Sequence, residues 1–136
     1  GKVMVRLTIL GEPVPASRPR VTRRGFAFTA EPYRSYKKMA HQVIKEQYSI
    51  EPLQGALHVQ IKFYRSVQKS VSKVERHRRL SGVHRPTMKP DIDNLFKSVT
   101  DACTGIVWKD DNQIVSTKSD KFYSEEPRVE IYVEEL

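Results

Sequence analysis

Three segments of the chain alternate strictly between apolar and polar residues. Their apolar positions are Val3, Val5, Leu7 and Ile9, then Leu57, Val59, Ile61 and Phe63, then Val129, Ile131 and Val133. Because successive side chains of a β-strand point to opposite faces, this alternation predicts three strands that bury one face of a shared sheet. A weaker strand is expected from Gln113 to about Phe122, and a short edge strand from Phe26 to Phe28.

Two other segments have helical periodicity and are expected to cover that sheet. The first has Thr29 as its N-cap and Pro32 in its first turn, where a missing N–H group is harmless. Its apolar face consists of Tyr36, Met39, Ala40, Val43 and Ile44. The second follows Pro90 and can end at Gly105 in the left-handed conformation. Its apolar face consists of Ile92, Leu95, Phe96, Val99, Ala102 and Cys103.

The chain has 136 residues and one continuous apolar pattern, which is the size of a single domain. We therefore expect residues 1–136 to form one α+β domain, in which a single small mixed sheet is packed by about two main helices. No apolar run approaches the roughly 20 residues of a membrane span, and no secretory signal opens the chain. These features predict a soluble, cytoplasmic protein that needs no membrane.

The sequence contains one cysteine and four histidines. Cys103 cannot close an internal disulfide by itself, and its place on an apolar helix face favours a buried core residue over a nucleophile. The histidines never approach the Cys/His spacing of a zinc site. Any metal ion is therefore expected to be bound by oxygen.

Basic residues are concentrated in two stretches that lack a buried pattern. The formal charge is +8, and residues 62–89 contain nine Lys or Arg against one Glu. Residues 13–25 and residues 66–89, the latter with a short helix around 71–80, are expected to form surface arms. Such arms attract a polyanion and contact backbone phosphates without recognising bases, although solvated surface charge is the alternative for any single residue. The residues expected to contact DNA are Arg18, Arg20, Arg23, Arg24, Lys69, Lys73, Arg76, Arg78, Arg79 and Lys89.

The acidic residues around the second helix suit a divalent metal ion. At about 100° per residue, Asp93 and Lys97 point away from the apolar face, about 40° from each other. Asp91 precedes them as N-cap, where extended geometry lets its carboxylate swing toward Asp93. Asp110 and Asp111 lie in a polar turn leading into the weaker strand, which can bring them beside the start of the helix. Hard carboxylates of this kind predict an Mg²⁺ site formed by all four acids, with Mn²⁺ able to substitute.

Each of these residues also has a simpler interpretation. Asp91 can serve only as an N-cap, and residues 110–112 can be only a turn. Lys97 can pair with Asp93 or Asp101 at four-residue spacing. No single acid is decisive, so the hypothesis of a metal site depends on their combination.

The sequence resembles the RusA family of Holliday-junction resolvases, small endonucleases often carried by prophages. The resemblance rests on DIDNLFK at residues 91–97, WKDDNQI at 108–114 and VPASRPR at 14–20. It implies a RusA-like homodimer with two acidic sites, each using Mg²⁺, that nicks opposing strands of a four-way DNA junction. It further implies that Asp91, Asp93 and Asp111 are the catalytic carboxylates, Asp110 an accessory one and Lys97 the catalytic lysine.

The expected activity is therefore that of a magnesium-dependent, structure-selective endodeoxyribonuclease that resolves junctions by paired nicks. The metal would activate a water molecule for attack on phosphorus, leaving 5′-phosphate and 3′-hydroxyl ends, while Lys97 offsets charge on the phosphate oxygens. Two alternatives stay open. One is a basic nucleic-acid-binding protein without catalysis, and the other is a general nuclease for branched or single-stranded DNA.

Overall fold

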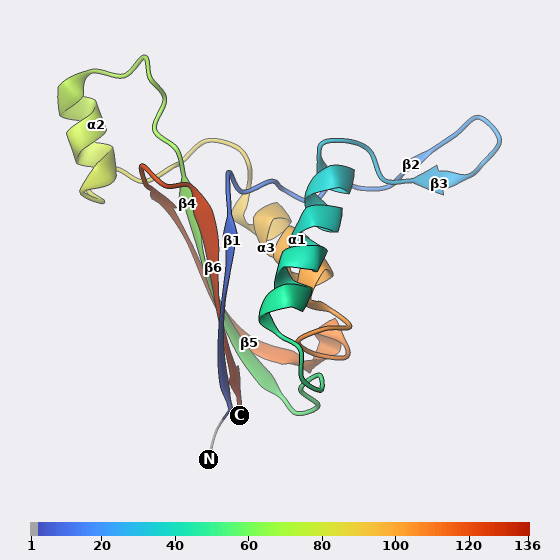
Figure 1. Cartoon of the computed structure of the whole chain (residues 1–136). Coiled ribbons are helices and arrows are strands. Elements are labelled where there is room, and N and C mark those ends of the chain that lie inside the picture. Colours follow the sequence, from blue (N-terminus) through green and yellow to red (C-terminus); the bar gives the residue numbers. More distant parts are fainter. Residues whose placement is uncertain (1–2) are drawn as a thin grey trace.

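The structure, a computed structural model, describes residues 3–136 and contains a four-stranded sheet with helices on one of its faces (Figure 1). The strands are β1 (Met4–Leu10), β4 (Leu57–Arg65), β5 (Ile114–Tyr123) and β6 (Arg128–Glu135). They lie in the order β1-β6-β4-β5, with β4 and β5 parallel and the other neighbours antiparallel. The α+β fold with a small mixed sheet is thus confirmed, including the weaker strand.

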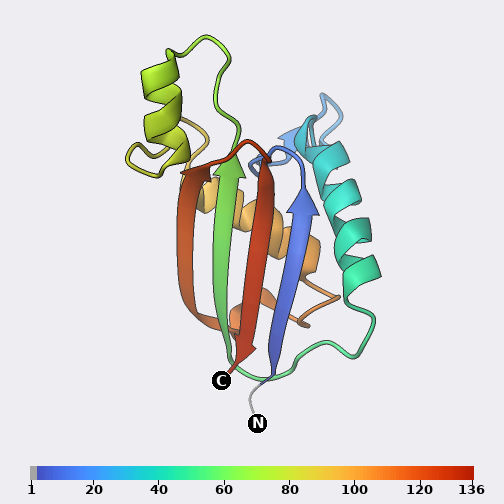
Figure 2. The same ribbon diagram turned by 60° about the vertical axis from the view of Figure 1, so that its left-hand side comes forward.

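The alternating residues of the sequence build the core. The apolar residues of β4 and β6 are buried, whereas the residues between them are partly exposed on the opposite face of the sheet. Strand β1 begins at Met4, so Val3 lies outside the strand and is exposed. Figure 2 shows α3 (Ile92–Cys103) behind the sheet and α1 (Tyr33–Gln47) beside β1. The core therefore lies between these two helices and one face of the sheet.

Helix α1 begins later than the sequence predicts. Its N-cap is Pro32 and its first residue is Tyr33, so the prediction of Thr29 as N-cap is wrong. The carboxylate of Glu31 takes over the capping role, because it accepts hydrogen bonds from the N–H (3.2 Å) and the hydroxyl (2.8 Å) of Ser35. These bonds lower the pKa of the Glu31 carboxyl.

Helix α3 has the predicted limits. Asp91 is its N-cap in an extended conformation, and Gly105 follows the helix with a positive φ of 89°. Most of the predicted apolar faces of both helices are buried or partly buried. The exceptions are Met39 of α1 and Ile92 of α3, which are exposed. No helix within residues 3–136 is long and apolar enough to cross a membrane.

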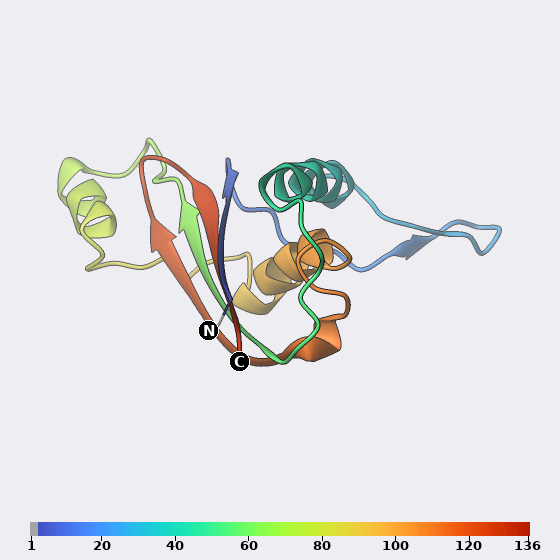
Figure 3. The same cartoon turned by 60° about the horizontal axis from the view of Figure 1, so that its bottom comes forward.

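Two segments project from opposite ends of the molecule (Figure 3). Strand β2 (Arg20–Val21) of the first basic arm pairs with β3 (Ala27–Phe28), which follows the arm, and the two form a separate hairpin. The predicted edge strand at residues 26–28 therefore does not join the main sheet, because it pairs with β2. Helix α2 (Lys73–Leu80) lies in the second basic arm, where a helix was expected, and Ser72 caps its N-terminus.

Candidate functional site

Two of the predicted carboxylates lie at the start of α3 and line one pocket. Asp91 is the N-cap, but its side chain accepts no hydrogen bond from the helix. The interpretation of Asp91 as only a cap is therefore not supported by its contacts. Asp91 and Asp93 are both exposed and line one open pocket of about 440 Å³, together with Asp120 of β5. Oδ1 of Asp93 accepts the N–H of Asn94 at 3.0 Å, and the pocket is open to solvent.

The chain immediately before Asp91 is held in place by two cations of the sheet. The Nζ of Lys121 donates hydrogen bonds to the carbonyl oxygens of Met88 and Pro90, both at 3.1 Å. The Nη1 of Arg65 donates to the carbonyl oxygen between them, that of Lys89, at 2.6 Å. Three consecutive carbonyl groups are therefore fixed from β4 and β5, which positions the backbone that carries Asp91.

Arg85 secures the same loop at a second point. Its Nε donates to the carbonyl oxygen of Lys121 (2.5 Å), and its Nη2 donates to the carboxylate of Asp120 (3.1 Å). Its guanidinium carbon lies 4.0 Å from the centre of the Phe122 ring, within range of a cation–π interaction. Sequence reasoning missed Asp120 and Lys121 because no local motif in β5 distinguishes them from ordinary surface charges.

The adjacent residues Asp110 and Asp111 have different roles. The carboxylate of Asp110 accepts the N–H of Asn112 (2.8 Å), and the side-chain oxygen of Gln113 accepts the N–H of Asp110 (2.8 Å). These bonds close a capping box around the short 3₁₀ helix η1 (Asp111–Gln113). Oδ1 of Asp110 is thus already hydrogen-bonded within its own turn.

Asp111 instead faces α3. Its Oδ1 accepts the indole N–H of Trp108 (3.1 Å) and the hydroxyl of Thr104. Its Oδ2 lies 3.9 Å from the Nζ of Lys97. The turn before β5 therefore comes beside α3, but its contacts are with Lys97 and with Thr104 at the C-terminal end of the helix, whereas the sequence analysis expected it beside the start of the helix.

Lys97 is held by a second carboxylate on its own helix. The Nζ donates to Oδ1 of Asp101 at 2.6 Å, and the phenol of buried Tyr33 in α1 donates to Oδ2 of the same carboxylate. The hydrogen bond with Asp101 is the main cause that raises the pKa of Lys97, and the charge of Asp111 adds to it. The pairing of Lys97 with Asp101 at four-residue spacing is thus confirmed, and it keeps the ammonium group protonated.

Among residues 3–136, no three His, Cys, Asp or Glu side chains are grouped closely enough to hold a metal ion. Asp91 and Asp93 share a pocket, whereas Asp111 lies next to Lys97. Mg²⁺ commonly binds through one or two carboxylates, with water and substrate phosphates completing its coordination. The donor chemistry of the Asp91 and Asp93 pair fits that pattern. The site with all four acids stays a prediction.

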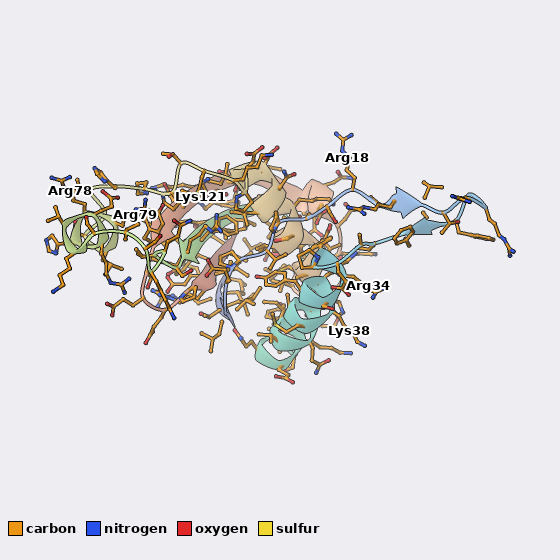
Figure 4. The ribbon with its side chains drawn as sticks, turned by 90° about the horizontal axis from the view of Figure 1, so that it is seen from above. Arg18, Arg34, Lys38, Arg78, Arg79 and Lys121 are labelled. Atoms are coloured by element: carbon orange, nitrogen blue, oxygen red, sulfur yellow. The ribbon has the colours of Figure 1, made fainter. Side chains whose placement is uncertain are left out.

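The first basic arm begins directly beside the acidic pair. The N–H of Ala16 donates to the carbonyl oxygen of Asn94 in the first turn of α3 (2.9 Å). From this anchor the hairpin extends away from the body, with Arg18 near its base (Figure 4). The residues of this arm that were predicted to bind DNA are Arg18, Arg20, Arg23 and Arg24. All four are exposed, and none has an acidic partner within 4 Å among the described residues.

Some of the predicted cations of the second basic arm pair with acidic residues, and others do not. Arg79 pairs with Glu75 (2.7 Å) and lies 4.9 Å from the ring centre of Tyr123, so it attaches α2 to the sheet. Arg76 pairs with Glu125 at 3.5 Å. The remaining predicted cations are exposed and have no acidic partner within 4 Å in the described part of the chain. They are Lys69, Lys73, Arg78 and Lys89.

Cys103 is fully buried in the core, as its place on the apolar face of α3 predicted. Burial is the main cause that raises the pKa of its thiol, and the nearby charge of Asp111 acts in the same direction. The thiolate form is therefore disfavoured, which leaves Cys103 outside the chemistry of the site.

Comparison with known proteins gives two findings. The family described as "Endodeoxyribonuclease RusA" matches residues 11–134. "Uncharacterized protein YqaN" of Bacillus subtilis (strain 168) is 40% identical over 97% of this chain and 96% of its own length. The family match covers both basic arms, α3 and the turn that contains Asp110 and Asp111.

Proposed function

The chain belongs to the RusA family of endodeoxyribonucleases, and from this premise we propose that it is a divalent-metal-dependent resolvase of four-way DNA junctions. The observation that carries the proposal is the placement of Asp91 and Asp93 in one accessible pocket at the base of the arginine-rich hairpin. An acidic pair beside basic arms suits a site that binds a metal ion and brings a phosphodiester to it.

We assign the metal ligands to Asp91 and Asp93, with Asp111 as the third catalytic carboxylate and Asp110 as an accessory one. When bound, Mg²⁺ or Mn²⁺ makes water a better nucleophile and offsets negative charge on the phosphate. Oδ1 of Asp111 accepts hydrogen bonds from Trp108 and Thr104, and Lys97 lies 3.9 Å from its Oδ2. To join the acidic pair, the Asp111 carboxylate would have to leave Trp108 and Thr104 when the metal ion binds in the protein–DNA complex.

The chain's own residues then have separate tasks. The protonated Nζ of Lys97, kept charged by Asp101, stabilises the additional negative charge that develops on the phosphate during attack by water. The clamp formed by Lys121 and Arg65 keeps Asp91 in position while charge builds up. The pocket stays open to solvent, so the water consumed in hydrolysis has access to it.

The two basic arms provide the grip on DNA. Their exposed cations contact backbone phosphates, so affinity should fall steeply with salt and show little dependence on base sequence. We leave Arg79 out of this surface because its guanidinium already pairs with Glu75 and packs on Tyr123. Arg76 contributes less than Arg78, because Glu125 is close to it.

Paired nicks need two acidic sites, and we propose that a homodimer supplies them, one site for each of two opposing strands. Sedimentation equilibrium of the purified protein, with and without a four-way junction, tests this part. A dimer that binds one junction is the expected species. A monomer at all concentrations, with or without DNA, would contradict the paired mechanism.

The activity itself is tested by incubating the purified protein with Mg²⁺ and either a synthetic four-way junction or a linear duplex of the same sequence. Symmetrical nicks in the junction and none in the duplex are expected. Equal cutting of both substrates would favour a general nuclease. Junction binding without cutting in Mg²⁺ or Mn²⁺ would favour a binding protein without catalysis.

A further inference from the structure

A second pocket lies on the other side of the first turn of α3, between that helix, α1 and the base of the hairpin. Its volume is about 480 Å³. Three cations line it, Arg18 of the hairpin, Lys37 of α1 and Lys97 of α3, and its only acid is Asp101. We call it the cationic pocket.

The charge of the cationic pocket is not balanced by its own residues. Both oxygens of Asp101 are already engaged, one by the Nζ of Lys97 and the other by the phenol of Tyr33. Arg18 and Lys37 have no acidic partner within 4 Å among residues 3–136, and the Nζ of Lys37 lies 5.9 Å from the centre of the Tyr33 ring. The pocket therefore keeps two unneutralised positive charges, which favour an anion.

The cationic pocket is connected to the acidic pair by a third hollow. This hollow is lined by Ala16, Lys89, Asp91 and Asn94 among others. It shares Asp91 with the pocket of the acidic pair and shares Ala16 and Asn94 with the cationic pocket. The three hollows thus follow one another around the first turn of α3. A single extended DNA strand lying over that turn would place one phosphate at the acidic pair and another in the cationic pocket.

We propose that the cationic pocket is a binding site for a backbone phosphate of the strand that is cut, a few nucleotides from the scissile phosphate. The inference rests on the proposed function for the identity of that strand. Lys37 is the residue whose substitution tests this site alone, because Lys97 also serves the acidic site and Arg18 also belongs to the hairpin. The ligand is a phosphodiester monoanion, and the site recognises no base.

The next residue of α1 provides a matched control. Lys37 and Lys38 are adjacent, exposed and equally charged, but only Lys37 lines the cationic pocket. Binding of a four-way junction by Lys37→Gln and Lys38→Gln is measured over a range of salt concentrations without divalent ions, so that cleavage cannot interfere. We expect Lys37→Gln to weaken binding about threefold to tenfold and to reduce the salt slope by about 0.9, the value for one lost phosphate contact. Lys38→Gln should change neither quantity measurably.

A second measurement locates the phosphate. Junctions with a neutral methylphosphonate at single positions near the branch point are bound to wild type and to Lys37→Gln. One position should weaken wild type but leave Lys37→Gln unaffected, because the variant has already lost that contact. Equal losses from Lys37→Gln and Lys38→Gln, or additive losses at every position, would overturn the proposal. A wild type that never cuts would contradict the proposed function alone, since neither measurement needs cleavage.

Discussion

The Nζ of Lys97 lies 3.9 Å from Oδ2 of Asp111, although one residue belongs to α3 and the other to the turn before β5. This contact joins the two sequence motifs in space. Oδ1 of Asp111 is fixed at the same time by the indole of the buried Trp108. The carboxylate is therefore aimed at α3 by the core of the protein rather than by the turn that contains it.

Tyr33→Phe is predicted to disturb the position of Lys97 indirectly, through Asp101. The phenol of Tyr33 donates to Asp101, and Asp101 in turn holds Lys97. Loss of that bond should reduce the free energy of unfolding by about 1 kcal/mol. It should also lower kcat roughly tenfold, with little change in KM, if Lys97 acts on the developing charge.

Tyr36→Phe is the matched control for this prediction. The hydroxyl of Tyr36 is buried on the same helix but has no hydrogen-bond partner among residues 3–136. Its removal should leave stability unchanged or slightly increased, and kcat unchanged. Urea denaturation and single-turnover cleavage check both variants. Equal effects of the two substitutions would contradict the positioning role of Tyr33.

Lys121→Met is predicted to loosen the backbone before Asp91. The variant loses two hydrogen bonds to the carbonyl oxygens of Met88 and Pro90, which should cost about 1–2 kcal/mol of stability. It should also raise the Mg²⁺ concentration needed for half-maximal cleavage. Lys118→Met, an exposed lysine of the same strand, should do neither. An unchanged Mg²⁺ requirement in Lys121→Met would show that the clamp does not position Asp91.

The main sheet and α3 could be predicted from the sequence because their signals are local. Alternation of apolar residues identified β1, β4 and β6, and Asp91 and Gly105 marked the limits of α3. The β2–β3 hairpin could not be assigned in the same way. Its two strands have two residues each, and their pairing depends on a turn and not on a buried face.

Trp108 should report whether Asp111 joins the metal site. It is the only tryptophan, and its indole N–H donates to Asp111. If the metal ion draws Asp111 away, titration of the protein–junction complex with Mg²⁺ should change the Trp108 fluorescence. Asp111→Asn should abolish that change, whereas Asp110→Asn should retain it, because Asp110 bonds to its own turn. The same response in both variants would contradict the separate roles of the two acids.

Cys103 is predicted to resist alkylation at alkaline pH. Burial raises the pKa of its thiol, so the native protein keeps the protonated form at pH values where a free thiol, with a pKa of about 8.5, is ionised. Labelling with a thiol reagent at about pH 9 should be slow in the native protein and rapid in denaturant. Rapid labelling of the native protein, with loss of activity, would place Cys103 in the accessible site.

The site was only partly predictable for a related reason. Helical spacing placed Asp93 and Lys97 and offered Asp101 as a partner of Lys97, but Tyr33 became connected to Asp101 only when α1 packed against α3. No sequence pattern marked Lys121 either, because it binds backbone carbonyl groups, which every residue has. Local patterns therefore identified the residues expected to act in the chemistry, whereas the residues that position them emerged from tertiary packing.

Asp93→Asn tests the assignment of the acidic pair, when junction binding and junction cleavage in Mg²⁺ are both measured on one preparation of the variant. Asp93 is exposed, so the substitution should leave the fold and the melting temperature intact. Binding within about twofold of wild type is expected, together with a loss of cleavage of at least about 1000-fold, comparable with removal of a principal catalytic group. Cleavage at the rate of wild type would contradict the assignment of the site.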